Sequence, residues 1–305
     1  MRLLATLGAF LFAGTVLATP LHNVVIFGDS LSDNGNLYEF MQHQLPPSPP
    51  YFKGRFTNGP VWIEHVIESY FPENPTEHLL DYAFGGAGVS EEEGDDDVLF
   101  TLRREVNNYF LTHDKASADS LFVVWIGANN YLALPEETEK TLQDVNAGID
   151  HTLQRLADQG AKHILVVNIP DLGRTPAALE FDAVDNLTYY TQEHNKRLNN
   201  TVSHLKEKYP AVEWLYFDMN EAFGNVLEYP QDYGFTNITG TCANSVVNEI
   251  TKKSVLKMVA KTTPKSDACD GYLFFDLVHP TALAHKILGN RARKMLDEEG
   301  VVLTD

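Results

Sequence analysis

The sequence predicts an α/β fold in which a parallel β-sheet is covered by helices. Short runs rich in β-branched and aromatic residues are apolar throughout, as expected for strands buried on both faces. Between these runs lie longer segments with apolar residues three or four positions apart, which is the spacing of amphipathic helices. Because parallel strands need such crossover helices, the alternation of the two patterns predicts the sheet and its cover together.

Five runs are predicted to be the strands of this sheet. In chain order they are Val24–Phe27, Leu79–Ala83, Leu121–Ile126, His163–Val167 and Val212–Phe217. We find no linker and no internal repeat, so the strands are expected to belong to one domain that covers residues 19–305.

Three helices are supported by particular residues. Apolar positions at helical spacing run from Leu142 to Leu156 and again from Leu187 to Leu205. A last helix is predicted to begin at Pro280, because the missing N–H of a proline would be unpaired in a first helical turn anyway. It is expected to run to about Glu299.

The composition describes a folded, acidic protein. The chain has 305 residues, of which 44% are hydrophobic, and this is enough to build a substantial core and to exclude global disorder. Against 23 Lys and Arg stand 42 Asp and Glu, which gives a formal charge of −19. This charge repels a phosphate backbone, so nucleic-acid binding is not expected as the main activity.

The first 18 residues have the pattern of a secretory signal peptide. Arg2 precedes an apolar stretch from Leu3 to Leu17, and compact residues lead to a predicted cleavage after Ala18. A membrane anchor is the alternative, but the stretch is shorter than the roughly 20 residues that a spanning helix needs. We therefore expect an exported protein, either extracellular or periplasmic.

Export determines how the two cysteines are interpreted. In an oxidising compartment Cys242 and Cys269 are predicted to form a disulfide, worth about 3.5 kcal/mol by the loop-entropy estimate. In a cytosolic chain the same residues would be read as two unpaired buried thiols. Four aromatic residues gather shortly before Cys242, and we expect them either to cover an acyl-chain groove or to anchor an ordinary loop. They are Phe223, Tyr229, Tyr233 and Phe235.

A serine follows the first predicted strand, in the string Gly28-Asp29-Ser30-Leu31-Ser32. In open α/β sheets ligands bind beyond the carboxyl ends of the strands, so this position favours a nucleophile. A Gly-Asp-Ser turn can also be only a turn or a helix cap. The choice between the two depends on whether the chain supplies a base.

A candidate base lies near the other end of the chain, in Phe275-Asp276-Leu277-Val278-His279. A hydroxyl becomes a good nucleophile only when a base removes its proton, and an imidazole serves only when its tautomer is held in place. A separation of three residues on a turn lets Asp276 accept from Nδ1–H of His279 while Nε2 faces the serine. The sequence thus predicts a Ser30, His279 and Asp276 triad.

Acyl transfer also needs donors for a developing oxyanion. Small residues after the second strand, Phe84-Gly85-Gly86-Ala87, allow a backbone N–H to approach a ligand closely. The third strand is followed by Gly127-Ala128-Asn129-Asn130, which offers a side-chain amide. Each string is ordinary turn material by itself, and their common place at strand ends is what favours a function.

These blocks, in this order and with Arg55-Phe56-Thr57-Asn58-Gly59 between them, resemble the GDSL, or SGNH, esterases and lipases. The resemblance covers nearly the whole chain after residue 18. It implies a flavodoxin-like three-layer α/β/α sandwich with a five-stranded parallel sheet. It also implies that Ser30 is the nucleophile, and that Gly86 and Asn129 join the Ser30 backbone N–H in the oxyanion hole. One departure is Asn130, where the family has an aspartate.

The resemblance is strongest to the secreted bacterial branch of lysophospholipases and glycerophospholipid:cholesterol acyltransferases. It implies a lysophospholipase A that contacts a lipid surface and needs no metal, no other cofactor and no stable protein partner. Two alternatives stay open. One is acyl transfer to cholesterol or another alcohol, and the other is a non-catalytic carbohydrate-binding or adhesion protein on the same fold.

Overall fold

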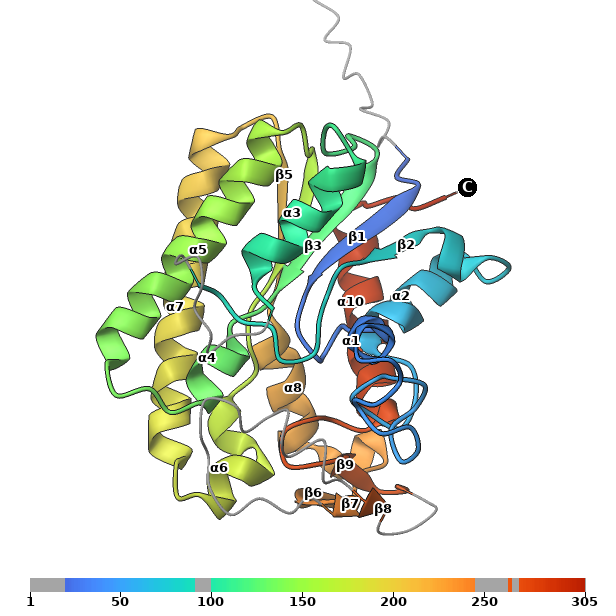
Figure 1. Ribbon diagram of the computed structural model, residues 1–305, viewed down its shortest axis with the longest axis vertical. Helices are drawn as coiled ribbons and strands as arrows, with labels where there is room; N and C mark the ends of the chain where they lie inside the picture. Colours follow the sequence, from blue (N-terminus) through green and yellow to red (C-terminus); the bar gives the residue numbers. More distant parts are fainter. Residues whose placement is uncertain (1–19, 91–99, 245–262, 265–268, 305) are drawn as a thin grey trace, which may run out of the picture.

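The computed structural model describes residues 20–90, 100–244, 263–264 and 269–304 (Figure 1). The predicted signal peptide, residues 1–18, lies outside the described residues. None of the described helices is long and apolar enough to cross a membrane.

The central sheet has five parallel strands in the order β2-β1-β3-β4-β5. They are β1 (Asn23–Gly28), β2 (Leu79–Asp81), β3 (Ser120–Trp125), β4 (His163–Val167) and β5 (Glu213–Phe217). All five predicted runs are confirmed as strands. The second ends at Asp81, two residues earlier than expected, although the N–H groups of Tyr82 and Phe84 still donate to carbonyls of β1.

Helices form a layer on each side of this sheet, so the predicted three-layer α/β/α sandwich is confirmed (Figure 1). One layer contains α3 (Leu102–Thr112), α5 (Thr138–Asp158) and α7 (Val184–Lys208), which pack in that order. The other contains α2 (Trp62–Tyr70), α8 (Met219–Glu228) and α10 (Ala282–Glu298).

Short elements complete the described chain and gather largely at the carboxyl end of the sheet. The helices are α1 (Asn36–Phe40), η1 (Pro75–Glu77), α4 (Ala128–Leu132), η2 (Leu172–Arg174), α6 (Pro176–Glu180) and η3 (Pro230–Tyr233). The strands are β6 (Asn237–Thr241), β7 (Ala243–Asn244), β8 (Thr263–Pro264) and β9 (Tyr272–Phe274).

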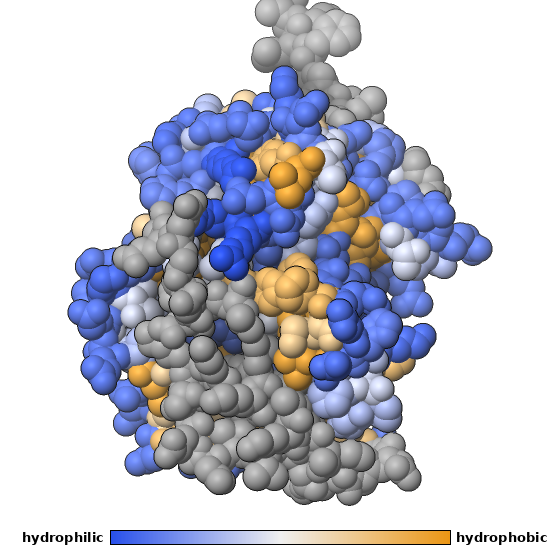
Figure 2. All heavy atoms as spheres, viewed as in Figure 1, coloured by the Kyte–Doolittle hydropathy of each residue, from blue (hydrophilic) through white to orange (hydrophobic). Residues whose placement is uncertain are grey.

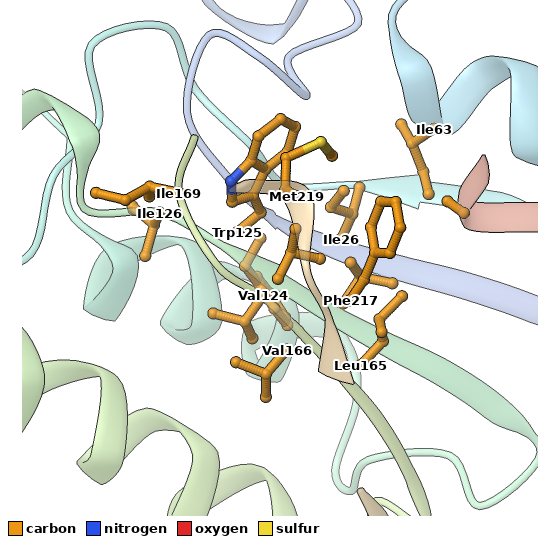
Figure 3. Packing of buried hydrophobic residues seen from close by; sticks show 14 of the residues in the cluster. Ile26, Ile63, Val124, Trp125, Ile126, Leu165, Val166, Ile169, Phe217 and Met219 are labelled. Atoms are coloured by element: carbon orange, nitrogen blue, oxygen red, sulfur yellow. The ribbon is translucent and has the colours of Figure 1, made fainter. Parts of the chain in front are cut away.

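The main core is formed by the strands and the inner faces of the helices. All six residues of β3 are buried, which explains why that run is apolar throughout. Figure 3 shows how side chains of neighbouring strands meet the first residues of α8, with Trp125 beside Met219. The strand ends, and therefore the loops that follow them, rest on a closely packed base.

The last helix begins later than the sequence predicted. It starts at Ala282, with Thr281 as its N-cap, and Pro280 lies before it. The chain between β9 and α10 turns back on itself, because Phe275 N–H donates to the carbonyl of His279 and Pro280 bridges to Phe274. These hydrogen bonds hold the segment in a tight loop and postpone the helix by two residues.

The predicted disulfide between Cys242 and Cys269 is present. Cys242 lies between β6 and β7, and this segment is attached to β9 and to the residue after it. Cys242 N–H donates to the Phe274 carbonyl at 3.1 Å, and Ala243 N–H donates to the Phe275 carbonyl at 2.8 Å. The disulfide therefore braces the segment that leads directly into Asp276.

Candidate active site

The turn after β1 raises Ser30 at the carboxyl end of the sheet. The carbonyl of Asp29 accepts from Ser32 N–H and Asp33 N–H, each at 3.0 Å, and its carboxylate accepts from Leu31 N–H at 3.0 Å. Gly28 is required just before this turn, since a Cβ there would lie 2.6 Å from the carbonyl oxygen of Trp125. The close approach of β1 and β3 thus fixes the start of the turn, and Ser30 is only 5% exposed.

The structure brings Ser30, His279 and Asp276 together. Nε2 of His279 lies 2.8 Å from Oγ of Ser30, and Nδ1 lies 2.7 Å and 2.9 Å from the two Asp276 oxygens. All three side chains are buried. This arrangement lets the carboxylate hold the Nδ1–H tautomer, so that Nε2 can accept a proton from the hydroxyl.

The acid of this relay has further partners that the sequence did not reveal. Tyr51 Oη donates to Asp276 Oδ2 at 2.5 Å, and the backbone N–H groups of Val278 and His279 donate to Oδ1 at 2.9 Å and 2.8 Å. Burial alone would raise the pKa of Asp276. The charge and hydrogen bonds of His279, with the Tyr51 and Val278 donors, outweigh burial and hold that pKa below its ordinary value.

Two backbone N–H groups at the site have no hydrogen-bond acceptor in the described part of the chain. One belongs to Ser30 and the other to Gly86, whose positive φ of 78° suits a glycine. The neighbours of Gly86 differ, because Gly85 N–H donates to Asp33 and Ala87 N–H donates to Phe84. Of the three N–H groups in this turn, only that of Gly86 is therefore left for a ligand, and Gly86 is the residue that the family resemblance implied.

Asn129 is fixed next to this turn. Its Nδ2 donates to the Ala87 carbonyl at 2.8 Å, and the second N–H of the amide remains for a ligand. Asn129 lines the same pocket as Ser30 and His279. Gly86 does not line that pocket itself. It is held next to the site because Ala87, the residue after it, accepts the hydrogen bond from Asn129.

The departure at Asn130 has a structural explanation. Its Oδ1 accepts from Val89 N–H and its Nδ2 donates to the Val89 carbonyl, both at 2.9 Å. A carboxylate could form only the first of these bonds. Asn130 thus ties the loop after β2 to α4.

Buried carboxyl groups support the nucleophile turn from below, and the sequence did not single them out. Asp33 accepts from the backbone N–H groups of Gly35, Asn36 and Leu37 and from Gly85 across the site. Burial raises the pKa of Asp33 to about 6, against the lowering effect of these four donors. Burial likewise raises the pKa of Asp29 to about 6.

Glu105 supports the same turn from α3. Its Oε2 accepts from Gly28 N–H at 2.9 Å, while the buried Oε1 has no partner in the described chain. Burial raises its pKa well above the ordinary value of a glutamic acid. Only the string around Asp29 and Asp33 could have suggested such a support, because Glu105 lies far away in the sequence.

A pocket opens beside Ser30. Asn129 and apolar residues of α4 and the η2 region form one side, and the other side is formed by α8, α10 and the loop around His279. The apolar lining includes Leu132, Pro170, Leu172, Met219, Phe223, Phe274 and Leu288. Within the described ranges, no group of three or more His, Cys, Asp or Glu side chains could hold a metal ion.

The prediction that four aromatic residues cover an acyl groove is wrong in most of its detail. Phe223 lines the pocket, but Phe235 is buried in the core and Tyr229 lies half exposed on the surface. Tyr233 packs against Arg291 of α10. One of these residues lies in α8, one in η3 and two in the turns beside η3, so their closeness in sequence does not place them on one surface.

Fold and geometry together define an α/β/α hydrolase with a Ser-His-Asp arrangement of the kind that serine esterases use. A comparison with protein families gives the particular group. The family model described as GDSL-like Lipase/Acylhydrolase matches residues 24–292, so the chain belongs to that family of ester hydrolases.

Three curated relatives show the range of proteins that the chain resembles. It is 30% identical to the phosphatidylcholine-sterol acyltransferase of Aeromonas hydrophila over 90% of either chain. It is 32% identical to the secreted effector protein SseJ of Salmonella typhimurium, over 86% of this chain and 60% of that protein. It is 27% identical to the thermolabile hemolysin of Vibrio parahaemolyticus, over 91% and 63%. The chain spans less than two thirds of the length of the last two.

Solved structures agree on the fold. Two catalytic mutants of Axe2, an acetylxylan esterase from Geobacillus stearothermophilus, match with TM-scores of 0.50 and 0.51. They are 16% and 13% identical to this chain, and the matches cover 93% of it and 97% and 98% of theirs. At this identity the likeness concerns the fold alone.

Proposed function

We propose that this protein is a secreted lysophospholipase A that hydrolyses fatty-acyl esters through an acyl-enzyme on Ser30. The observation that carries the proposal is the 2.8 Å contact between Ser30 Oγ and His279 Nε2 at the edge of a largely apolar pocket. A nucleophile and its base at the mouth of such a pocket suit an ester with a hydrocarbon acyl group.

The first half of the reaction forms the acyl-enzyme. His279 Nε2 takes the Ser30 proton while Oγ attacks the ester carbonyl carbon, and Asp276 stabilises the imidazolium that results. The N–H groups of Ser30 and Gly86 and the free N–H of Asn129 are the proposed donors to the oxyanion. When the C–O bond breaks, His279 returns the proton to the leaving alcohol oxygen.

The second half releases the fatty acid. Water enters where the alcohol left, gives a proton to His279 Nε2 and attacks the acyl carbon through the same oxyanion geometry. The bond to Ser30 Oγ then breaks as His279 reprotonates the serine. No group outside the triad has to move a proton in this cycle.

The two sides of the pocket divide the substrate. The oxyanion donor Asn129 belongs to α4, and the apolar residues Leu132 and Leu172 lie on that side. His279 must reach the alcohol oxygen, so the alcohol portion passes on the side of α8 and α10. We therefore place the acyl chain against α4 and η2.

Export is part of the proposal. The predicted signal peptide and the disulfide between Cys242 and Cys269 support an extracellular or periplasmic location, and the relative from Salmonella typhimurium is a secreted effector. Export of the chain with residues 1–18 and its retention in the cell without them would test this part.

Acyl transfer to a sterol or another alcohol is a second candidate. It is favoured by the 30% identity to a phosphatidylcholine-sterol acyltransferase over 90% of either chain. In that reaction an alcohol replaces water in the second half, and the proton movements stay the same.

One assay separates these functions. Purified protein is incubated with a labelled lysophospholipid, with and without cholesterol, beside Ser30→Ala. Free fatty acid in both samples supports lysophospholipase activity, whereas a cholesteryl ester that forms at the expense of fatty acid supports transfer. Failure of a fluorophosphonate to label Ser30 would reject both and favour a non-catalytic binding protein.

A further inference from the structure

A second imidazole reaches the pocket from α10. His285 is only 1% exposed, yet it lines the pocket together with Ser30 and His279. Its Nδ1 accepts the backbone N–H of Trp62 at 3.2 Å. Because that nitrogen is an acceptor, a neutral ring must carry its proton on Nε2.

The proton on Nε2 has no partner in the described protein. No acceptor in the described ranges of the chain receives it. Two other histidines, His65 and His194, also have an unpartnered Nε2, but theirs is sealed inside the protein. Nε2 of His285 is not one of these sealed atoms, and the residue lines the pocket, so the pocket is where its proton can meet a ligand.

This donor keeps its character at any pH at which the enzyme would work. Burial, followed by the charges of His279 and His65, lowers the pKa of His285 to about 3. The ring therefore stays neutral, with one acceptor that is occupied and one donor that is free. Apolar side chains, among them Trp125, Phe274 and Leu288, line the same pocket.

The position of His285 indicates which part of a substrate it meets. It lies six positions after His279 on the same segment, and both line the side of the pocket that α10 forms. His279 must contact the alcohol oxygen of the ester, and Asn129 contacts the carbonyl oxygen from the other side. A donor on the His279 side therefore meets the alcohol portion.

We propose that His285 Nε2–H binds a second oxygen on the alcohol portion of the ester, namely a free hydroxyl next to the esterified carbon, as in a monoacylated glycerol. His285 would then select esters of polyols over esters of simple alcohols. The proposal rests on the serine chemistry proposed above and adds a specificity residue to it.

The test uses two pairs of esters, and the members of each pair differ only in one hydroxyl group. The first pair is a 1-acyl-lysophosphatidylcholine and its 2-deoxy analogue, and the second is a 1-monoacylglycerol and the matching propane-1,3-diol monoester. We expect the unaltered enzyme to prefer the ester with the hydroxyl by about tenfold in kcat/KM, as for one neutral hydrogen bond. A ratio near one for both pairs in the unaltered enzyme would overturn the proposal without any variant.

Variants then assign the preference to the residue. His285→Phe should bring the ratio close to one. His285→Gln retains an acceptor for Trp62 N–H and a donor for the ligand, and should keep part of the preference. The matched control is His65→Phe, which removes a partly buried imidazole that does not line the pocket and should leave the ratio unchanged. An unchanged ratio in His285→Phe would equally reject the assignment.

Failure of this inference can be told apart from failure of the lysophospholipase proposal. If the monoacylglycerol pair shows the hydroxyl preference while lysophospholipids are not hydrolysed, the role of His285 stands and the substrate assignment falls. If lysophospholipids are hydrolysed and neither pair shows a preference, the lysophospholipase assignment stands and the role of His285 falls.

Discussion

The nucleophile turn and the acid-base segment both bury a carboxyl group beside the same reaction centre, but with opposite electrostatic results. Asp29 is 3% exposed and Asp276 is 2% exposed. Burial raises the pKa of Asp29 to about 6, whereas the pKa of Asp276 lies below its ordinary value. Burial acts in the same direction on both, and at Asp276 it is outweighed by the charge of His279 first and then by the hydrogen-bond donors around the carboxylate.

The two regions also differ in where their support comes from. The carboxylate of Asp29 accepts from Leu31, two residues further on. Asp276 accepts from Tyr51, which is 225 positions away, and from donors of its own loop. The Asp29 carboxylate is thus held within its own turn, while the Asp276 carboxylate also depends on a side chain from a distant part of the fold. Four changes would break or sharpen this contrast.

The largest effect is expected from Asp276→Asn. An amide cannot hold His279 in the tautomer that leaves Nε2 free to accept a proton, so kcat should fall by about 10⁴-fold. Asp29→Asn keeps an oxygen for Leu31 N–H and should lose less than tenfold. Steady-state kinetics on a soluble ester would measure both, and equal losses would erase the distinction between the two carboxyl groups.

Asn129→Ala tests the side of the site opposite to the acid-base segment. Loss of one oxyanion donor typically costs about 100–1000-fold in kcat, and KM should change little because the donor acts mainly in the transition state. The Ala87 carbonyl also loses its partner, so the thermal unfolding of the variant must be recorded alongside. Wild-type turnover in a folded variant would remove Asn129 from the oxyanion hole.

Tyr51→Phe removes a single hydroxyl from the acid. Without that donor more negative charge remains on Asp276, which favours the imidazolium form of His279 and makes it a poorer base at low pH. We expect kcat/KM to fall by about tenfold, as for one buried charge-assisted hydrogen bond, and the acidic limb of the pH profile to move to higher pH. A fall in activity with an unmoved limb would show that Tyr51 only fills space.

The parts of this fold that were predictable from sequence are those whose signal is local. Five apolar runs became five strands. A strand in the middle of a parallel sheet, such as β3, is buried on both faces, and its sequence is therefore apolar throughout. The serine turn and the Asp276 and His279 pair were found through spacing within a few residues. The start of α10 was misplaced because the hydrogen bonds that delay it, such as the one from Phe275 to His279, belong to a loop and not to a helix pattern.

What the sequence could not predict is long-range support. Tyr51, Glu105 and His285 each act across many residues, on Asp276, Gly28 and the pocket respectively. A lone tyrosine, a glutamate in an amphipathic helix and one histidine among eleven carry no pattern that marks them. Only the fold shows which atoms they face.

The smallest effect concerns stability, and it distinguishes the two carboxyl groups by the pH at which each acts. The raised pKa of Asp29 means that the folded protein holds a proton there which the unfolded chain has lost. Its contribution to the free energy of unfolding is therefore present below about pH 4 and is lost as pH rises through about 6. Asp276 has a lowered pKa, so its contribution is present at neutral pH and is lost only as pH falls below about 4.

Denaturant unfolding at pH 7 and pH 5 would reveal this difference. From pH 7 to pH 5, Asp29→Asn should gain less stability than the unaltered protein, by on the order of 1 kcal/mol. Asp276→Asn is not a matched comparison over this range, because loss of the Asp276 charge also changes the electrostatic environment of His279. The decisive comparison is between Asp29→Asn and the unaltered protein, which keep the same histidines and the same Asp276. If these two proteins gained the same stability from pH 7 to pH 5, burial would not hold a proton on Asp29.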